Sequence, residues 1–125
     1  MSKSAQDFLS EANSMVPSIA VAEALSLINS GKAVVIDVRD GKEIDQSGTV
    51  KNALRIPCGM IEFVADPTSS FYNDQISNDK EILVICGAGG MAALTGKTMM
   101  EMGYTNVHNI GGFSAWKDAG GPTED

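Results

Sequence analysis

The sequence predicts an α/β fold with a central, mainly parallel sheet flanked by helices. Two continuous apolar runs, residues 33–37 and 82–85, are typical of short strands that are covered on both faces. Apolar residues at helical spacing lie between such runs, so strands and helices alternate along the chain. This alternation favours right-handed crossovers and three layers, with the sheet in the middle.

The first half of the chain predicts a helix over residues 4–14, a helix over 21–30, a strand over 33–37 and a strand over 53–56. The second helix ends at Gly31, because glycine readily adopts the left-handed conformation that stops a helix. A polar loop over 41–48 contains a turn of helix around Glu43. The stretch 58–79 is rich in Asn, Asp and Ser, and we expect at most a short helix near Met60–Val64.

The second half predicts a strand over residues 82–85, a helix over 91–102, a strand over 106–110 and a helix over 113–119. Gly103 ends the longer helix, and Gly111-Gly112 forms a tight turn before the last one. Trp116 fits the core-facing side of that last helix. One face of the longer helix is also expected in the core, through Met91, Leu94, Thr95, Thr98, Met99 and Met102.

The composition suits one globular domain, since 43% of the 125 residues are hydrophobic and 20% are charged. A formal net charge of −7 without a basic stripe argues against a nucleic-acid partner. The sequence has no signal-peptide core and no membrane-length apolar run, so we expect a cytoplasmic protein with no membrane partner. Two cysteines and one histidine predict neither a disulfide framework nor a metal site, and we expect no cofactor.

Cys86 is the main candidate for a catalytic residue. It follows the apolar run 82–85 and opens the segment Cys86-Gly87-Ala88-Gly89-Gly90, after which a helix is expected. The N–H groups of such a loop and the positive end of the helix favour a thiolate, which is the nucleophilic form of cysteine. The alternative is a small buried hydrophobic residue, but a strand that continues into a packed core does not need these glycines. We therefore expect Cys86 to be solvent-reachable and to react faster than Cys58.

Asp37 and Arg39 lie at the end of another predicted strand, residues 33–37. Ligands of parallel sheets bind outside the carboxyl ends of the strands, so both residues are expected at the same edge as Cys86. One interpretation is that their charges orient the Cys86 loop or meet a sulfur donor. The other is a structural network in which Arg39 pairs with Asp37 or Glu43 and fixes the loop that follows. We favour the structural network.

Two stretches together resemble the rhodanese (sulfurtransferase) superfamily. The first contains Val35-Ile36-Asp37-Val38-Arg39, Glu43, Gly48-Thr49-Val50, Ala53 and Ile56-Pro57. The second contains Cys86 with its loop, Met102-Gly103-Tyr104-Thr105-Asn106-Val107, Gly111-Gly112-Phe113-Ser114-Ala115-Trp116 and Gly120. The order and spacing of these pieces resemble the family over roughly residues 17–122.

The resemblance implies a rhodanese-like domain over residues 16–122, with an N-terminal helical extension over 1–15 and a flexible tail over 123–125. It also implies a sulfurtransferase in which Cys86 takes a sulfane sulfur from a small donor, either thiosulfate or a persulfide. Cys86 would hold that sulfur as its own persulfide and pass it to a thiol or a protein acceptor. The loop backbone would stabilise this persulfide, through Gly87, Ala88, Gly89, Gly90, Met91 and Ala92.

The chain departs from the family pattern in this loop. Many single-domain members carry Arg at the sixth position, where this chain has Met91; related phosphatases use a longer loop whose Arg aligns with Ala92. A missing guanidinium argues strongly against phosphatase activity and less strongly against sulfur transfer. It puts efficient use of dianionic thiosulfate in question. The alternative is a sulfur-carrier or protein-interaction module with little activity on free thiosulfate.

Three other residues carry less functional weight. Thr49 replaces the His of the family's Gly-His-Ile triplet, and we interpret this as a structural change. Cys58 could resolve a persulfide on Cys86 as a disulfide, but we favour a packing role. His108 could act as a general base, although the loop already supplies the field that activates the thiol.

Overall fold

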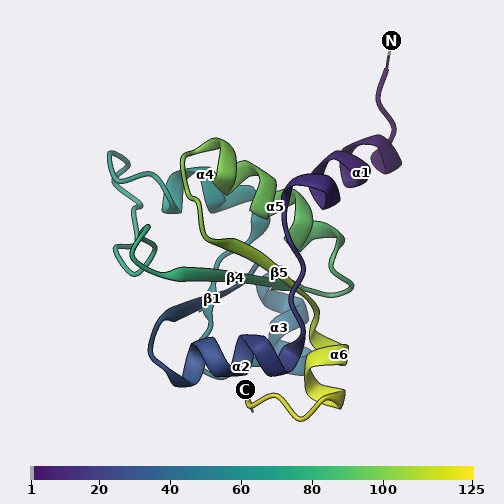
Figure 1. The fold of residues 1–125 in the computed structure, drawn as a ribbon, viewed down its shortest axis with the longest axis vertical. Helices are drawn as coiled ribbons and strands as arrows, with labels where there is room; N and C mark the ends of the chain where they lie inside the picture. The colour runs from purple at the N-terminus through teal and green to yellow at the C-terminus, as the bar shows by residue number, and fades with distance from the viewer. Residues whose placement is uncertain (1) are drawn as a thin grey trace.

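Four parallel strands form the central sheet, in the order β3-β1-β4-β5 (Figure 1). The computed structural model describes residues 2–125. The strands are β1 (Ala33–Asp37), β3 (Leu54–Arg55), β4 (Glu81–Cys86) and β5 (Val107–Gly112). Every neighbouring pair in this sheet is parallel, which confirms the predicted fold class and the position of each predicted strand.

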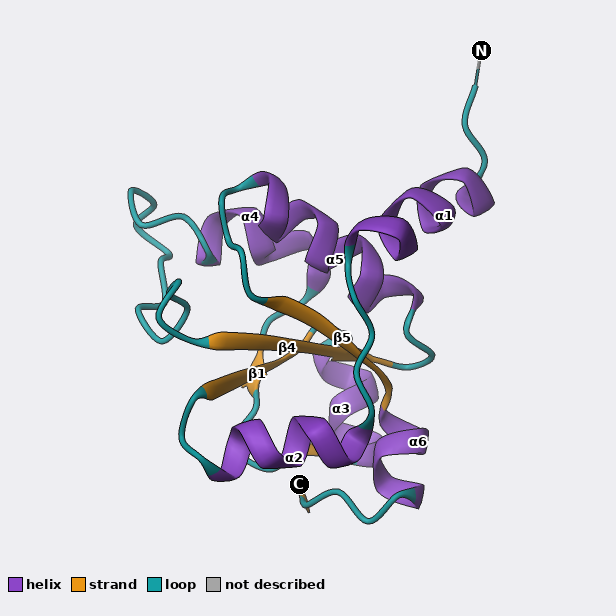
Figure 2. Ribbon diagram, in the orientation of Figure 1, coloured by secondary structure: helices purple, strands orange, loops and turns teal. Residues whose placement is uncertain are grey.

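Helices lie on both sides of the sheet (Figure 2). One side carries α1 (Ala5–Met15), α4 (Ile61–Val64) and α5 (Gly90–Glu101), with α1 packed on α5 and the 3₁₀ helix η1 (Cys58–Met60) leading into α4. The other side carries α2 (Val21–Asn29), α3 (Gly41–Ser47) and α6 (Phe113–Asp118). The helices predicted over 4–14, 21–30, 91–102 and 113–119 are therefore confirmed to within two residues at each end.

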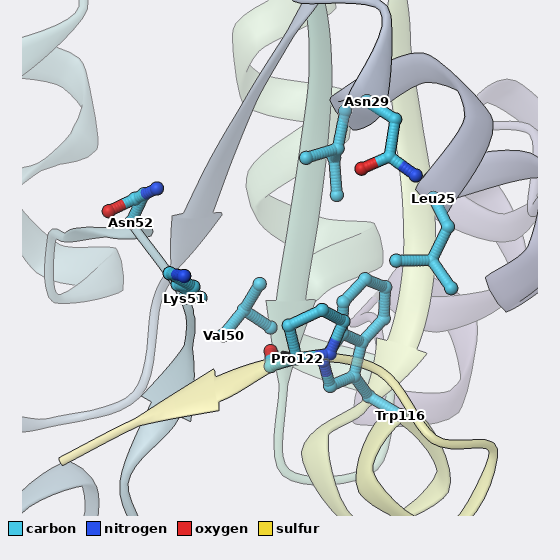
Figure 3. Close-up of a pocket in the computed structure, with 8 residues that line it drawn as sticks. Leu25, Asn29, Val50, Lys51, Asn52, Trp116 and Pro122 are labelled. Carbon is cyan, nitrogen blue, oxygen red and sulfur yellow. Dashed lines mark hydrogen bonds between the residues drawn. The ribbon is translucent and has the colours of Figure 1, made fainter.

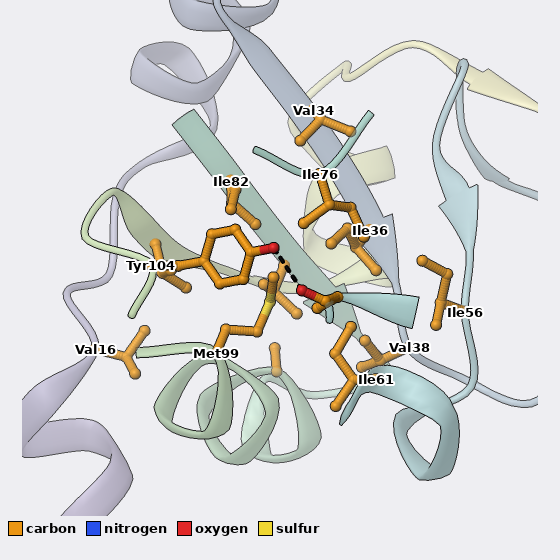
Figure 4. Close-up of a cluster of buried hydrophobic side chains, with 14 of the residues drawn as sticks. Val16, Val34, Ile36, Val38, Ile56, Ile61, Ile76, Ile82, Met99 and Tyr104 are labelled. Atoms are coloured by element: carbon orange, nitrogen blue, oxygen red, sulfur yellow. Dashed lines mark hydrogen bonds between the residues drawn. The ribbon is translucent and has the colours of Figure 1, made fainter. Parts of the chain in front are cut away.

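Each face of the sheet has its own hydrophobic cluster, because side chains alternate along a strand. Val34 belongs to the cluster under α5, whereas its neighbour Val35 belongs to the opposite cluster with Trp116. Figure 4 shows the cluster under α5, where the Tyr104 hydroxyl donates a hydrogen bond of 2.5 Å to the Ala65 carbonyl. Burial of its polar end is thus compensated by a partner.

Local capping explains where several helices begin and end. Gly31 and Gly103 adopt φ angles of +76° and +107° just after α2 and α5, as predicted for helix stops. Helix α3 is longer than the predicted turn around Glu43. Its first turn is stabilised because the Asp40 carboxylate accepts a hydrogen bond of 3.0 Å from the Glu43 backbone N–H.

The predicted core face of α5 is partly wrong. Met99 is buried as expected, but Met91 and Leu94 are 39% and 38% exposed. The helix instead presents small residues to its neighbours, and a Cβ on Gly96 would lie 2.9 Å from a Val16 methyl group. Close approach of the segment after α1 therefore needs this small face, and the longer side chains turn outward.

The end of the chain, expected as a flexible tail over residues 123–125, contains a short strand instead. Strand β6 (Thr123–Glu124) pairs antiparallel with β2 (Thr49–Val50), which the sequence also did not indicate. The Pro122 carbonyl accepts hydrogen bonds of 3.1 Å from the Lys51 N–H and 3.0 Å from the Trp116 indole. Backbone partners from distant segments thus hold this end of the chain.

Candidate active site

Cys86 is the last residue of β4, and α5 begins four residues later at Gly90. We call residues 86–92 the Cys86 loop. The Cys86 sulfur accepts hydrogen bonds from the backbone N–H of Gly89 at 2.9 Å and of Ala92 at 3.3 Å. Gly89 adopts φ +98°, a left-handed conformation that brings its N–H onto the sulfur and opens the helix. The loop and the positive end of a twelve-residue helix thus converge on the sulfur.

The prediction that Cys86 is solvent-reachable is wrong, since the residue is only 1% exposed. The end of β5 covers the loop from one side. A Cβ on Gly112 would lie 2.3 Å from the Gly87 carbonyl oxygen, so only glycine permits this approach. The sulfur is therefore held inside the loop, and its backbone partners lie in the same enclosed space.

Side chains of the Cys86 loop contribute little charge or bulk around the sulfur. Ala92 is fully buried, and its N–H faces Cys86, whereas the Met91 side chain is 39% exposed. The loop sequence contains neither lysine nor arginine. Within the loop, stabilisation of an anion consequently comes from backbone dipoles. From outside the loop, the Arg39 guanidinium lies within electrostatic reach of Cys86, which is the smallest of the causes that raise the Arg39 pKa.

Asp37 and Arg39 form a buried ion pair beside the loop. The shortest contact, between Arg39 Nη2 and an Asp37 carboxylate oxygen, is 2.8 Å, and the two side chains are 3% and 0% exposed. Arg39 also donates to the Ser47 hydroxyl at 2.9 Å and the Gly48 carbonyl at 2.8 Å, while Thr49 donates to Asp37 at 2.7 Å. Hydrogen bonding to Asp37 raises the pKa of the Arg39 guanidinium above its ordinary value.

This arrangement matches the structural network that the sequence favours. The guanidinium carbon of Arg39 lies 4.6 Å from the centre of the Phe113 ring, which adds a cation–π contact. Glu43 is more distant, with an oxygen 3.8 Å from Arg39 Nη1, and is half exposed. Thr49, at the position of the family's His, is fully buried and serves the same network.

Cys58 lies across β1 from Cys86 and is exposed, in contrast to the packing role favoured from the sequence. The Cys58 N–H donates to the Val38 carbonyl, and the Val38 N–H donates to the Ile85 carbonyl. Two strand spacings of about 4.8 Å thus place Cys58 roughly 10 Å from Cys86. A disulfide requires Cα atoms within about 7 Å, so both cysteines are free thiols here.

His108 is not brought to Cys86. Its Nε2 atom lies 3.3 Å from a Glu81 carboxylate oxygen, and Glu81 is the first residue of β4 whereas Cys86 is the last. Within the described part of the chain its Nδ1 atom has no hydrogen-bond partner. A catalytic cysteine–histidine pair is therefore absent from residues 2–125.

In the described part of the chain, cavities border the Cys86 loop at several points. A cavity of about 340 Å³ touches Gly87 and extends toward Arg39. A second, of about 350 Å³, touches the loop at residues 88–90 and extends toward α1. A third, of about 160 Å³, contacts Met91 and Cys58. Cys86 itself lines none of these three cavities, in keeping with its burial.

A cavity of about 380 Å³ lies away from the loop, between α2, β2 and α6 (Figure 3). Its walls include no residue of the Cys86 loop, and no cysteine or histidine lines it. This cavity is larger than those that border the Cys86 loop, but we assign the chemistry to the loop because the nucleophile lies there. The lining residues are Leu25, Ile28, Asn29, Val50, Lys51, Asn52, Trp116 and Pro122.

Residues 2–125 contain no group of three or more His, Cys, Asp or Glu side chains that could hold a metal ion. Among the helices of the described chain, none is long and apolar enough to cross a membrane.

Asn109 is the residue near the loop that the sequence analysis missed. Its side chain donates to the Gly89 carbonyl at 3.0 Å and accepts from the Gly111 N–H at 2.7 Å. The available signal was a polar amide in a predicted strand, two residues before a Gly-Gly pair. The predicted tight turn at Gly111-Gly112 belongs to β5, where this amide braces it.

Comparison with known proteins identifies the family of the chain. A family model described as the rhodanese-like domain matches residues 20–119. The adenylyltransferase and sulfurtransferase UBA4 of Candida albicans is 33% identical over 91 residues, which cover 72% of this chain and 20% of that protein. The thiosulfate sulfurtransferase GlpE of Coxiella burnetii is 29% identical over 112 residues, which cover 89% of this chain and 95% of that protein.

A solved structure extends the similarity to the N-terminal helix. The Rhodopseudomonas palustris protein RPA3614, of unknown function and described as a possible tyrosine phosphatase, aligns with a TM-score of 0.90 at 37% identity. The alignment covers 99% of this chain and 96% of that one. It therefore includes α1, which lies before the part matched by the family model.

Proposed function

The chain belongs to the rhodanese-like domain family, and on this premise we propose that it is a sulfurtransferase that carries a sulfane sulfur on Cys86. Relatives named as sulfurtransferases support sulfur transfer in general. The observation that carries the proposal is the pair of backbone N–H groups, from Gly89 and Ala92, that donate to the Cys86 sulfur at 2.9 Å and 3.3 Å. They stabilise the negative charge of the Cys86 thiolate, the form that attacks a sulfur donor.

In the first half-reaction, the Cys86 thiolate attacks the outer sulfur of a donor such as thiosulfate. A sulfur–sulfur bond forms at Cys86, the sulfur–sulfur bond of thiosulfate breaks, and sulfite leaves with the bonding electron pair. The product is a persulfide whose terminal sulfur is negatively charged. The loop N–H groups that already point at the Cys86 sulfur need no reorganisation during this step.

In the second half-reaction, an acceptor attacks the terminal sulfur and restores the Cys86 thiolate. With cyanide as the acceptor, the product is thiocyanate. Neither step needs a proton when the donor is thiosulfate and the acceptor is cyanide, so the reaction does not require His108, which is bound to Glu81. A thiol or a protein thiol would take the place of cyanide in a cell.

A second candidate is a carrier module that accepts sulfur from a persulfide and uses free thiosulfate poorly. The absence of lysine and arginine from the loop favours this candidate. Thiosulfate is a dianion that a cationic side chain would help to bind, whereas a persulfide group carries at most one negative charge. The same absence argues against phosphoryl transfer, which relies on a guanidinium to hold the phosphate. Aryl phosphate is therefore a control substrate on which we expect no turnover.

The test is the intact mass of the protein after incubation with thiosulfate or with glutathione persulfide. We expect the wild-type protein to gain one sulfur atom and to lose it to cyanide. The Cys86→Ser variant should gain none and show no turnover, because oxygen cannot form the persulfide. Cys58→Ser is the matched control and should behave as the wild type does.

Loading from both donors supports an enzyme that uses thiosulfate, and loading from the persulfide alone supports the carrier module. If the wild-type protein gains no sulfur from these or any other donors while its thiols are titratable, the sulfurtransferase proposal fails and a non-catalytic interaction role takes its place.

A further inference from the structure

The end of β5 is irregular where it meets the Cys86 loop. Val84 pairs with Asn109 and Cys86 pairs with Gly112, so β5 has one more residue than β4 between these pairs. Such an extra residue is a β-bulge, a feature that often re-aims the chain next to an active site. Gly111 adopts φ +88° within it, and the bulge brings Gly112 against Gly87.

The Asn109 carboxamide joins this bulge to the loop. Its oxygen accepts a hydrogen bond of 2.7 Å from the Gly111 N–H, and its nitrogen donates one of 3.0 Å to the Gly89 carbonyl. Asn109 is 6% exposed. Both ends of the amide are thus used, one on each of the two segments that enclose Cys86.

The Gly89 contact connects Asn109 to the nucleophile. The Gly89 carbonyl accepts hydrogen bonds from Asn109 and, at 3.0 Å, from the Ala93 N–H of α5. The Gly89 N–H is the closer of the two donors to the Cys86 sulfur, at 2.9 Å. Because one pair of backbone angles links this carbonyl to this N–H, holding the first orients the second.

The backbone of Asn109 is itself held by the segment that follows α1. Its N–H donates to the Pro17 carbonyl at 2.8 Å, and its carbonyl accepts from the Ile19 N–H at 3.2 Å. Ser18 thereby forms a parallel bridge with Asn109 on the outer side of β5. Asn109 is therefore fixed through its backbone as well as through its side chain.

We infer that Asn109 is a positioning residue for the Cys86 thiolate and persulfide, acting through the backbone of Gly89. The inference rests on the proposed function for its effect on turnover, but not for its effect on the thiolate. Loss of the Asn109 donor leaves the Gly89 carbonyl held by the Ala93 N–H alone and loosens the orientation of the Gly89 N–H toward the sulfur. A hydrogen bond to a charged group is strong enough that its loss should lower turnover about tenfold.

The experiment compares Asn109→Ala, Asn109→Asp and Asn78→Ala, each in a Cys58→Ser background so that Cys86 is the only thiol. Asn109→Asp keeps an acceptor for the Gly111 N–H but cannot donate to the Gly89 carbonyl. Asn78 is the matched control: its side chain also donates to a backbone carbonyl, of Gly103, and accepts from a backbone N–H, of Thr105. The readouts are ultraviolet thiolate absorbance at neutral pH, kcat/KM for sulfur transfer and the melting temperature.

We expect both Asn109 variants to lose thiolate absorbance and about tenfold in kcat/KM, and Asn78→Ala to keep both within about twofold. The inference is overturned if Asn109→Asp retains wild-type absorbance, or if Asn78→Ala loses as much as Asn109→Ala at a similar melting temperature. If the unsubstituted protein transfers no sulfur, the proposed function fails, and thiolate absorbance alone decides the role of Asn109.

Discussion

The ends of β1 and β4 lie side by side in the sheet, yet they handle charge in opposite ways. At the end of β1, the Asp37 carboxylate and the Arg39 guanidinium pair at 2.8 Å and are buried together. At the end of β4, the Cys86 sulfur faces two backbone N–H groups and no charged side chain of its own loop. The formal charges at the end of β1 are thus paired with each other, while the donors nearest to the nucleophile are backbone N–H groups, with the Arg39 charge acting on Cys86 from farther away.

The difference indicates that the end of β1 serves the stability of the fold and the end of β4 serves the sulfur chemistry. A buried ion pair attracts a charged ligand only weakly, since each partner neutralises the charge of the other. A loop of N–H groups at a helix end, in contrast, carries only partial charges and can accept an anion that comes and goes. Substitutions at the two strand ends should therefore change different properties, stability at one and sulfur chemistry at the other.

Asp37→Asn tests the β1 side and should have the largest effect on stability. Removing one charge leaves Arg39 buried without its partner, and we expect the free energy of unfolding to fall by about 3 kcal/mol. Urea denaturation measures this. Glu43→Gln is the matched control, because Glu43 is half exposed and 3.8 Å from Arg39, and it should cost less than about 1 kcal/mol.

The folded fraction of Asp37→Asn should still load sulfur on Cys86 at a rate within about twofold of the wild type, if charge here serves the scaffold. Equal losses of unfolding free energy in Asp37→Asn and Glu43→Gln would contradict this division of roles. Loss of sulfur loading in the folded Asp37→Asn protein would also contradict it.

Met91→Arg tests the β4 side by adding the charge that the loop lacks. Met91 borders the loop cavity that also contacts Cys58, so a guanidinium there can approach a dianionic donor. We expect kcat/KM for thiosulfate to rise about tenfold, mainly through a lower KM, as for one charge-assisted hydrogen bond. Steady-state kinetics measure this change.

Met102→Arg is the control for Met91→Arg, because it adds the same charge to an exposed methionine just beyond the other end of α5. An equal gain in both variants would mean that net charge, not position in the loop, limits the use of thiosulfate.

Tyr104→Phe tests how much a buried polar group without charge changes the free energy of unfolding. It removes the hydrogen bond of 2.5 Å to the Ala65 carbonyl, and we expect a loss of about 1 kcal/mol at neutral pH. Burial is the main cause that raises the pKa of Tyr104 above its ordinary value. The contribution of neutral Tyr104 is therefore complete below about pH 10 and is lost as the pH rises through the raised pKa.

Thermal melting at pH values from neutral to about 11 checks this sign. The wild-type protein should lose stability in the alkaline range more steeply than Tyr104→Phe. Tyr72→Phe removes a similar hydrogen bond, of 2.7 Å to the Ile76 carbonyl, and should keep most of the wild-type slope. Burial, the main cause of the raised Tyr104 pKa, remains, and only the smaller electrostatic contribution of Tyr72 is lost. A wild-type slope in Tyr104→Phe would assign the alkaline loss to another group.

Local signals in the sequence were enough to predict most of the fold. The apolar runs 33–37 and 82–85 became central strands, since burial on both faces leaves a continuous apolar pattern. Gly31 and Gly103 ended their helices because the left-handed conformation is a property of the residue itself. The Cys86 loop was found for the same reason: strand, glycines and helix are contiguous.

Features that depend on distant segments could not be predicted in this way. The burial of Cys86 comes from Gly112, which lies on another strand, and the exposure of Met91 comes from the packing of α5 against the segment after α1. The pairing of β6 with β2 joins two-residue strands whose alternation is too short to be recognised. Asn109 was missed because its partners, Gly89 and Gly111, become neighbours only in the folded sheet.

The bulge in β5 makes this site depend on chain length as well as on residue identity. Removing the extra residue would draw the following chain back by about 3.3 Å, one strand step. Gly112 would then leave Gly87, and Phe113 would withdraw from the Arg39 guanidinium that it now meets at 4.6 Å. A single-residue deletion between Asn109 and Phe113 would thus disturb both strand ends at once while changing no side chain that touches Cys86. The length of this short segment is therefore a property of the site in its own right, and an engineered change of the site would have to preserve it.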